Sequence, residues 1–136
     1  MLKAAKTTEI LIKVKNKPGE LYRLLGAIAA GGMNVIAYMA QPHEESHSLV
    51  HLVAEDADEA ARLLQAASFS FVTQEVIAVE KRNHVGSEVE LTRRLGAANI
   101  NIHHAYATAT GETNYVSILR TSDNDSAIKA LSHKSA

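Results

Sequence analysis

The residues of this chain best suited to chemistry form a short polar turn, Asn16-Lys17-Pro18-Gly19-Glu20-Leu21. A glycine at the mouth of a helix lets a ligand approach the backbone closely. The free N–H groups of the first helical turn, together with the helix dipole, favour a carboxylate. The Asn16 amide can donate to a carboxylate or accept from an ammonium group. The turn therefore suits a small zwitterion, although Asn-x-Pro-Gly is also ordinary turn chemistry.

A second candidate is His43-Glu44-Glu45-Ser46-His47, which matches the His-Glu-x-x-His pattern of zinc hydrolases. That chemistry needs both histidines one turn apart on a helix, with the glutamate activating a metal-bound water. Here the run follows Pro42 and lies between two strand-like segments. We therefore expect a hairpin turn at this position, and a hydrolase built on His43, Glu44 and His47 is the least favoured interpretation.

The remaining candidates for metal or covalent chemistry are few. The chain has no cysteine, which excludes disulfides, thiolate catalysis and zinc–sulfur sites. His103 and His104 are neighbours in a predicted strand, so their side chains point to opposite faces and cannot chelate one metal together. We predict no catalytic residues, no metal site and no cofactor.

Composition narrows the classes of partner. The chain has 136 residues, of which 46% are hydrophobic and 21% charged, as in ordinary globular proteins. A net charge of −1 and only 4% aromatic residues argue against nucleic-acid binding. No apolar run is long enough to span a membrane, and Met1–Glu9 lacks the hydrophobic segment of a signal peptide. We expect a cytoplasmic protein without membrane partners.

The polar turn belongs to an internal repeat. Asn16 to Leu64 aligns with Asn83 to Leu131 without a gap, at a constant offset of 67 residues. Chance would give roughly three identities over such a window, so a duplication is the natural explanation. The identical pairs include Asn16/Asn83, Gly19/Gly86, Leu24/Leu91, Asn34/Asn101, Ala40/Ala107, Glu45/Glu112, Asp56/Asp123, Asp58/Asp125, Ala60/Ala127 and Leu64/Leu131.

The elements that position these residues follow from periodicity and from turn signals. Strands are predicted at 8–15, 33–41 and 47–55, because these segments are rich in β-branched and alternating apolar residues. Leucines at helical spacing predict a helix between 20 and 30, which the Gly31-Gly32 pair ends. Asp56 is expected to cap a second helix, which has an acidic first turn.

The second repeat follows the same order. Residues 69–80 are long enough to close the first unit and to open the second. A helix at 87–98, strands at 100–108 and 114–121, and a helix at 125–131 follow. The order is strand, helix, strand, strand, helix, strand, which predicts an α+β fold of two tandem ferredoxin-like βαββαβ units, with antiparallel sheets and helices on one face.

The second unit departs from this order at its end. Only Ser132 to Ala136 follow Leu131, so this unit lacks a last strand of its own. An unpaired edge in so small a sheet invites pairing with a neighbour. We therefore expect either strand-sharing between the units or a homodimer.

The first turn and the later run Gly32-Met33-Asn34-Val35-Ile36 resemble the signature of ACT domains, regulatory modules that bind amino acids. The resemblance covers nearly the whole chain as two copies, an ACT-like domain at 7–74 and a truncated one at 75–136. It implies that the ligand lies where two units meet, with residues of the second strand facing the loop of the other unit. The ligand-binding residues implied in the first copy are Asn16, Pro18, Gly19, Glu20, Leu21, Asn34, Val35 and Ile36.

The second copy departs from this signature. Val85 replaces the proline and Glu88 replaces the apolar Leu21, while Ser87 with Glu90 could form a capping box and shift the helix start. We expect a weakened second site, and one ligand per chain or unequal affinities follow. The residues that the pattern assigns to it are Asn83, Gly86, Ser87, Asn101 and Ile102.

These observations favour a non-catalytic regulatory protein that binds an amino acid or similar small effector at a domain or subunit junction. A regulated partner protein would sense the bound state. The alternative is an oligomerisation or protein-interaction module without a ligand. The two differ in whether any amino acid stabilises the protein.

Overall fold

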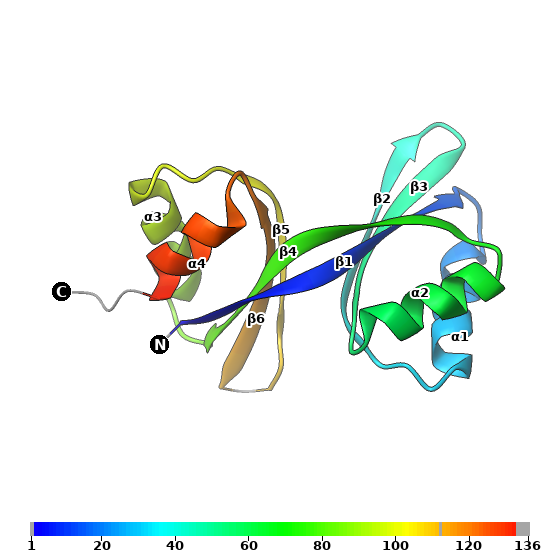
Figure 1. Cartoon of the computed structure of the whole chain (residues 1–136), viewed down its shortest axis with the longest axis horizontal. Helices are drawn as coiled ribbons and strands as arrows, with labels where there is room; N and C mark the ends of the chain where they lie inside the picture. The colour runs from blue at the N-terminus through cyan, green and yellow to red at the C-terminus, as the bar shows by residue number, and fades with distance from the viewer. Residues whose placement is uncertain (1, 112, 133–136) are drawn as a thin grey trace. The chain divides into compact units, whose positions relative to one another are not determined.

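The computed structural model describes residues 2–111 and 113–132, and these form two compact units. The first unit is Thr8–Gln74, and the second combines residues 2–7 with the described residues from Glu75 onward. In each unit two helices cover one face of an antiparallel sheet (Figure 1). The α+β fold predicted from the repeat is confirmed. The elements are β1 (Lys3–Lys15), α1 (Glu20–Ala30), β2 (Val35–Glu44), β3 (His47–Ala54), α2 (Ala57–Ala66), β4 (Ser70–Arg82), α3 (Ser87–Ala97), β5 (Ile102–Ala109), β6 (Asn114–Thr121) and α4 (Asn124–Ser132).

In the first unit the strand order is β2-β3-β1-β4. Strand β1 pairs antiparallel with β3, and Ile10 lies opposite Leu52. Alternate residues of β1 enter the core beneath the helices, because successive side chains of a strand point to opposite faces. The buried core residues are Ile10, Ile12, Val14, Leu24, Ile28, Val50, Leu52, Ala54, Ala60, Leu64 and Phe69.

The helices of the two units begin with matching signals. Asp56 caps α2 by accepting from the Glu59 backbone N–H at 3.1 Å, as the sequence predicted. Asp123 does the same before α4, where its carboxylate accepts from the Ser126 N–H at 3.0 Å. An N-cap carboxylate satisfies a helix-start donor that has no intrahelical partner.

The second unit has the strand order β1-β4-β6-β5, and the start of β1 occupies the place of a last strand. Leu2 and Ala4 pack against the core of this unit, which includes Leu91 and Leu95. Lys6 forms an ion pair with Asp125 in the first turn of α4, with 2.5 Å between nitrogen and oxygen. The edge expected to be vacant is therefore occupied by the chain's own N-terminal residues.

Within the described residues no strand follows α4, and residues 133–136 lie outside that part of the chain. Glu112, one of the identities of the repeat, also lies outside it. The hairpin expected at the His-Glu-x-x-His run is confirmed, since Glu44 ends β2 and His47 begins β3. No helix among the described residues has the length and apolar character needed to cross a membrane.

One prediction at the second turn is wrong. Helix α3 begins at Ser87, which corresponds to Glu20 at the start of α1, so the helix start has not shifted. The Ser87–Glu90 capping box is not formed, because Gly86 is the N-cap residue and Glu90 binds arginines. The serine hydroxyl instead donates to backbone carbonyls that precede the helix.

Candidate functional site

The first polar turn ends at Gly19, the N-cap residue of α1, with φ 91°. This left-handed conformation disfavours residues with a Cβ. The Gly19 carbonyl accepts from the Arg23 N–H at 2.9 Å, and the Asn16 N–H is bonded to the Ser46 carbonyl at 2.9 Å. Within the described residues the backbone N–H groups of Leu21 and Tyr22 have no backbone acceptor. They are the open donors of a helix start.

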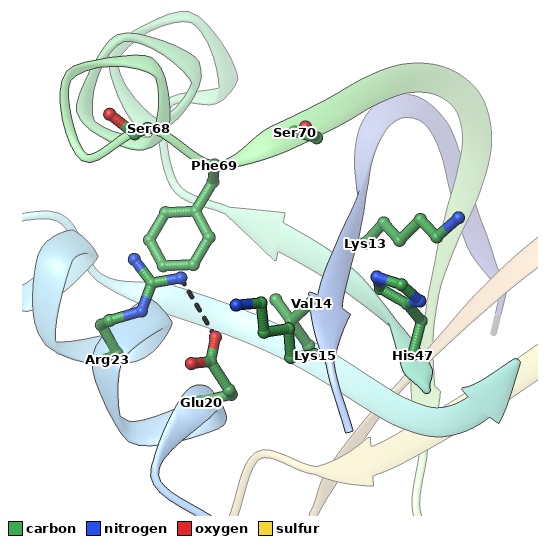
Figure 2. A pocket seen from close by; sticks show the side chains of 9 residues that line it. All are labelled: Lys13, Val14, Lys15, Glu20, Arg23, His47, Ser68, Phe69 and Ser70. Atoms are coloured by element: carbon green, nitrogen blue, oxygen red, sulfur yellow. Dashed lines mark hydrogen bonds and ion pairs between the residues drawn. The ribbon is translucent and has the colours of Figure 1, made fainter. Parts of the chain in front are cut away.

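A cavity of about 450 Å³ opens where β1 ends and α1 begins. The turn 16–19 joins two of its lining residues, Lys15 and Glu20. Lining side chains come from β1, α1, β3 and residues 68–70, which lead into β4 (Figure 2). The charged, titratable and aromatic residues among them are Lys13, Lys15, Glu20, Arg23, His47 and Phe69.

Arg23 is held in place by two contacts within this cavity. Its Nη2 donates to Glu20 Oε2 at 3.0 Å, and its Cζ lies 4.1 Å from the centroid of the buried Phe69 ring. A planar guanidinium fixed between a carboxylate and an aromatic face is pre-organised for further hydrogen bonds. Figure 2 shows Arg23 beside the Phe69 ring, with its guanidinium directed at Glu20.

Glu20 is the anionic group of the cavity. The hydrogen bond from Arg23 lowers the pKa of Glu20 below its usual value, so the carboxylate is ionised at neutral pH. Its Oε1 has Lys17 at 3.9 Å, beyond hydrogen-bond distance. The cavity thus offers cations at Lys15 and Arg23 and one carboxylate with spare acceptor capacity.

The predicted residues of the first copy do not all lie together. Glu20 lines the cavity, whereas Asn16, Pro18, Gly19 and Leu21 do not. Val35, at the start of β2, pairs with Ala54 of β3. Ile10 of β1 pairs with Leu52, two residues before Ala54 on β3. The start of β2 therefore lies at the level of residue 8 of β1, where this unit begins. The polar turn begins at Asn16, eight residues further along the chain, and this length of strand spans about 26 Å. Asn34, Val35 and Ile36 are therefore remote from the turn within one unit.

The sequence analysis did not identify the basic residues of the cavity or its aromatic residue, Phe69. Lys13 and Lys15 alternate at the end of a strand, and Arg23 follows Glu20 at a spacing of three on the helix. These spacings place Lys13 and Lys15 on one strand face, and Glu20 and Arg23 on one helix face. Phe69 carried no such signal, because its approach to Arg23 depends on tertiary packing.

The second turn has the same backbone but different side-chain bonding. Gly86 is the N-cap residue of α3, with φ 90°. The Ser87 hydroxyl donates to the Arg82 carbonyl at 2.6 Å and accepts from the His84 N–H at 3.1 Å. The Asn83 backbone N–H is bonded to the Thr113 carbonyl at 2.9 Å. Ser87 is therefore bonded within the turn itself.

The two asparagines before β2 and β5 have a shared backbone role. The Asn34 carbonyl accepts from the Glu55 N–H at 3.0 Å, and the Asn101 carbonyl accepts from the Ser122 N–H at 2.9 Å. Glu55 and Ser122 are equivalent in the repeat. Ile102, the remaining predicted residue, begins β5 and packs against the core of its unit.

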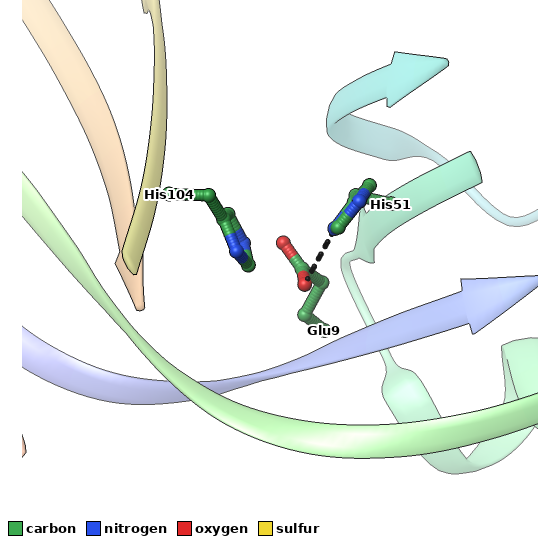
Figure 3. Close-up of side chains that lie close together, drawn as sticks. All are labelled: Glu9, His51 and His104. Carbon is green, nitrogen blue, oxygen red and sulfur yellow. Dashed lines mark hydrogen bonds and ion pairs between the residues drawn. The ribbon is translucent and has the colours of Figure 1, made fainter. Parts of the chain in front are cut away.

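A buried glutamate–histidine pair lies elsewhere in the first unit. His51 Nδ1 is 3.0 Å from Glu9 Oε1, and both side chains are buried (Figure 3). Gln74 Nε2 donates to the same Glu9 oxygen at 2.6 Å. A buried carboxylate requires such partners, because desolvation without them is costly. This pair links β1, β3 and β4.

Comparison with known proteins places the fold. No family model matches the sequence, and no curated protein matches it. Among solved structures, a protein of Bacteroides thetaiotaomicron is 21% identical, with a TM-score of 0.85 over 94% of this chain and 88% of that one. The regulatory subunit of aspartate kinase from Thermus thermophilus, in a ligand-free form, is 16% identical, with a TM-score of 0.67 over 96% and 93%. A putative C-terminal regulatory domain of aspartate kinase from Porphyromonas gingivalis is 16% identical, with a TM-score of 0.57 over 97% and 95%.

These neighbours share the fold of this chain, and that fold is the ACT type indicated by the sequence signature. Identities this low establish architecture and leave the ligand open, since one fold hosts many activities.

Proposed function

We propose that the first unit binds a small zwitterion, an amino acid or a close analogue, and that the chain is a non-catalytic regulatory protein. The observation that carries the proposal is the pairing of opposite charges in one cavity. Lys15 and Arg23 can take the ligand's carboxylate, and Glu20 can take its ammonium group. The ACT-type fold supports the same class of function, as does the likeness to a regulatory subunit and to a putative regulatory domain of aspartate kinase.

Regulation would work through linkage. A bound effector favours the arrangement of the chain that binds it more tightly, and a partner protein senses that arrangement. Equal affinity for both arrangements would change nothing, however tight the binding. The regulated partner is therefore expected to alter effector affinity by the same factor by which the effector alters partner affinity.

A thermal-shift screen of the twenty amino acids tests the proposal. Each hit is compared with its 2-oxo acid, which lacks the ammonium group, and with its amine, which lacks the carboxylate. We expect at least one amino acid to stabilise the protein, by about 2.7 kcal/mol at a ligand concentration of 100 times Kd. Both truncated analogues should bind at least tenfold more weakly.

The decisive variant is Arg23→Gln, with Arg62→Gln as its control. Arg62 pairs with Glu59 three residues away on the exposed side of α2, so it repeats the Glu20–Arg23 arrangement outside the cavity. Arg23→Gln should abolish the thermal shift, and Arg62→Gln should preserve it. The proposal is wrong if no amino acid stabilises the wild type, or if both variants respond as the wild type does.

Self-association is the second candidate function, favoured by the exposed surface of β2. Ile36 and Tyr38 are 45% and 47% exposed on this strand, which is an edge of the first unit's sheet. A dimer could bring Asn34, Val35 and Ile36 of one subunit toward a turn of its partner. Light scattering should then give a dimer mass for the wild type and a monomer mass for Tyr38→Lys. A control variant, Tyr22→Lys on α1, should remain dimeric, and a monomeric wild type would exclude this candidate.

A further inference from the structure

The second unit has its own cavity, at the place equivalent to the first. Its volume is about 290 Å³, and it opens between the end of β4 and the start of α3. Arg82 occupies the position of Lys15, Ser87 that of Glu20, and Glu90 that of Arg23. The site was therefore retained in both copies, while the chemistry of its walls changed.

The change removes the group that could receive an ammonium ion. Ser87 stands where the first cavity has a carboxylate, and its hydroxyl is bonded to the backbone of the turn. Glu90 accepts from Arg93 at 2.8 Å and from Arg94 at 2.8 Å through its Oε1, and from Arg93 at 3.2 Å through its Oε2. Both oxygens of the only carboxylate on the described wall are thus engaged by arginines.

The change also adds a buried cation. The Lys81 side chain is 2% exposed, and its Nζ lies 2.5 Å from Glu88 Oε1 and 2.5 Å from Ser117 Oγ. Ser117 in turn donates to Glu88 at 2.7 Å. The equivalent residues of the first unit are Val14, Leu21 and Val50, an apolar set.

A lysine does not replace a core valine without partners, because burying an unpaired charge is costly. Here the partners changed with it, so that an ion pair bonded to a serine hydroxyl stands where the first unit has three apolar residues. The three residues Lys81, Glu88 and Ser117 differ together from their first-unit equivalents, and Lys81 lines the cavity. This combination indicates that the side chains around the second cavity changed as a set. The weakened second site expected from the sequence signature does not account for them.

We propose that this cavity binds a small oxyanion that carries no ammonium group, with the chemistry shared by inorganic phosphate and by a compact dicarboxylate. Arg82 would supply the direct donors, because a guanidinium matches both anions in geometry. Arg94, which donates to Glu90 and to the Leu131 carbonyl at 3.2 Å, adds a second guanidinium to the same wall. Lys81 lies in the same wall, where its ion pair with Glu88 holds it in place. The chain would then respond to two chemically different effectors, one for each unit.

Calorimetric titration of the full chain with inorganic phosphate, and separately with malonate, tests this proposal. Arg82→Gln is the test variant and Arg62→Gln, on α2 and outside both cavities, is its control; both side chains are exposed, so folding should persist. We expect Arg82→Gln to weaken binding at least tenfold and Arg62→Gln to leave it within about twofold of the wild type.

Each outcome decides a point. Binding of phosphate alone or of malonate alone identifies the oxyanion, and binding of both supports the shared chemistry. Binding of neither anion, or equal loss in both variants, overturns the proposal. The proposed zwitterion site is tested with amino acids and Arg23→Gln, and the oxyanion site with phosphate, malonate and Arg82→Gln. Either proposal can therefore fail while the other stands.

Discussion

At the scale of single residues, the two glycines of the repeat are explained by the backbone. Gly19 and Gly86 both lie in the left-handed region, with φ of 91° and 90°, and each precedes the first residue of a helix. A residue kept in both copies needs a reason that applies twice, and this conformation supplies one. The two ligands that we propose must therefore be distinguished by side chains that differ between the copies, above all Glu20 against Ser87.

The first prediction concerns Gly19. A Cβ added there would meet no atom within 4 Å, so Gly19→Ala is penalised only by its left-handed backbone. We expect a loss of about 1 kcal/mol in the free energy of unfolding, measured in urea. Gly26→Ala, within helix α1 and equally free of contacts, should instead gain about 0.5–1 kcal/mol. Similar effects of the two substitutions would contradict the conformational explanation.

The second prediction concerns pH. Hydrogen bonds from Arg93 and Arg94 lower the pKa of Glu90 to about 2. Because the folded-state pKa lies below the unfolded value, the carboxylate stabilises the fold fully above about pH 4.5 and loses this contribution as pH falls toward 2. Glu90→Gln should therefore be less stable than the wild type at pH 7, and the difference should vanish near pH 2. A constant difference across that range would rule out the linkage; NMR titration of the Glu90 carboxyl gives the pKa directly.

At the scale of elements, strand β4 and helix α3 have the same backbone arrangement as β1 and α1 but different side chains between strand and helix. Val14 and its equivalent Lys81 both point toward the helix layer, one into an apolar set and the other into a bonded charged set. The backbone is the same because strand pairing and helix starts set it. The side chains need only satisfy one another.

The third prediction tests that mutual satisfaction. Lys81→Val alone should lower the free energy of unfolding by on the order of 2 kcal/mol, because buried Ser117 loses its donor and Glu88 loses its ion-pair partner. The triple variant Lys81→Val, Glu88→Leu and Ser117→Val, which copies the first unit, should return to within about 1 kcal/mol of the wild type. Urea unfolding measures both. A triple variant as damaged as the single one would show that the three residues are not coupled.

The order of helices and strands was predictable because local signals coincided. Asp56 before an acidic turn, Gly31-Gly32 after leucines and the alternation in β1 each mark a boundary that the structure keeps. The charges around the first cavity were predictable only in part. Glu20 was identified from the turn pattern, but its grouping with Arg23 and Phe69 depends on how α1 packs against the segment between α2 and β4.

The start of β1 was also mispredicted by sequence periodicity. The predicted strand began at residue 8, yet β1 begins at Lys3. Lys3 to Thr7 carries few β-branched residues, and its strand conformation comes from pairing within the second unit. Nothing local in Ala4-Ala5-Lys6 reveals that the partner strand is β4, which begins only at Ser70.

At the scale of the whole molecule, the N-terminal residues complete the sheet of the unit that comes second in the sequence. Ala4 packs against that core, and Lys6 joins Glu75 at 3.8 Å as well as Asp125 at 2.5 Å. Such an exchange ties the chain's beginning to its later half. It also covers an edge that would otherwise invite non-native pairing.

The fourth prediction follows from this exchange. Ala4→Asp should place an unpaired charge against the second core and destabilise that unit by about 2–3 kcal/mol. Ala5→Asp, on the exposed neighbour, should cost less than about 0.5 kcal/mol. Hydrogen exchange should show lost protection in β4 and β6 for the first variant only. Equal protection in the two variants would mean that residues 2–7 do not support this unit.

The central claim is that a zwitterion binds in the first cavity, its carboxylate on Lys15 and Arg23 and its ammonium group on Glu20. NMR titration of the ¹⁵N-labelled chain with each of the twenty amino acids tests it most directly. The account predicts saturable shifts for at least one amino acid, centred on the amides of residues 20–23 and 68–70 and absent in Arg23→Gln. Shifts confined to other residues, or no saturable shift with any amino acid, would contradict it.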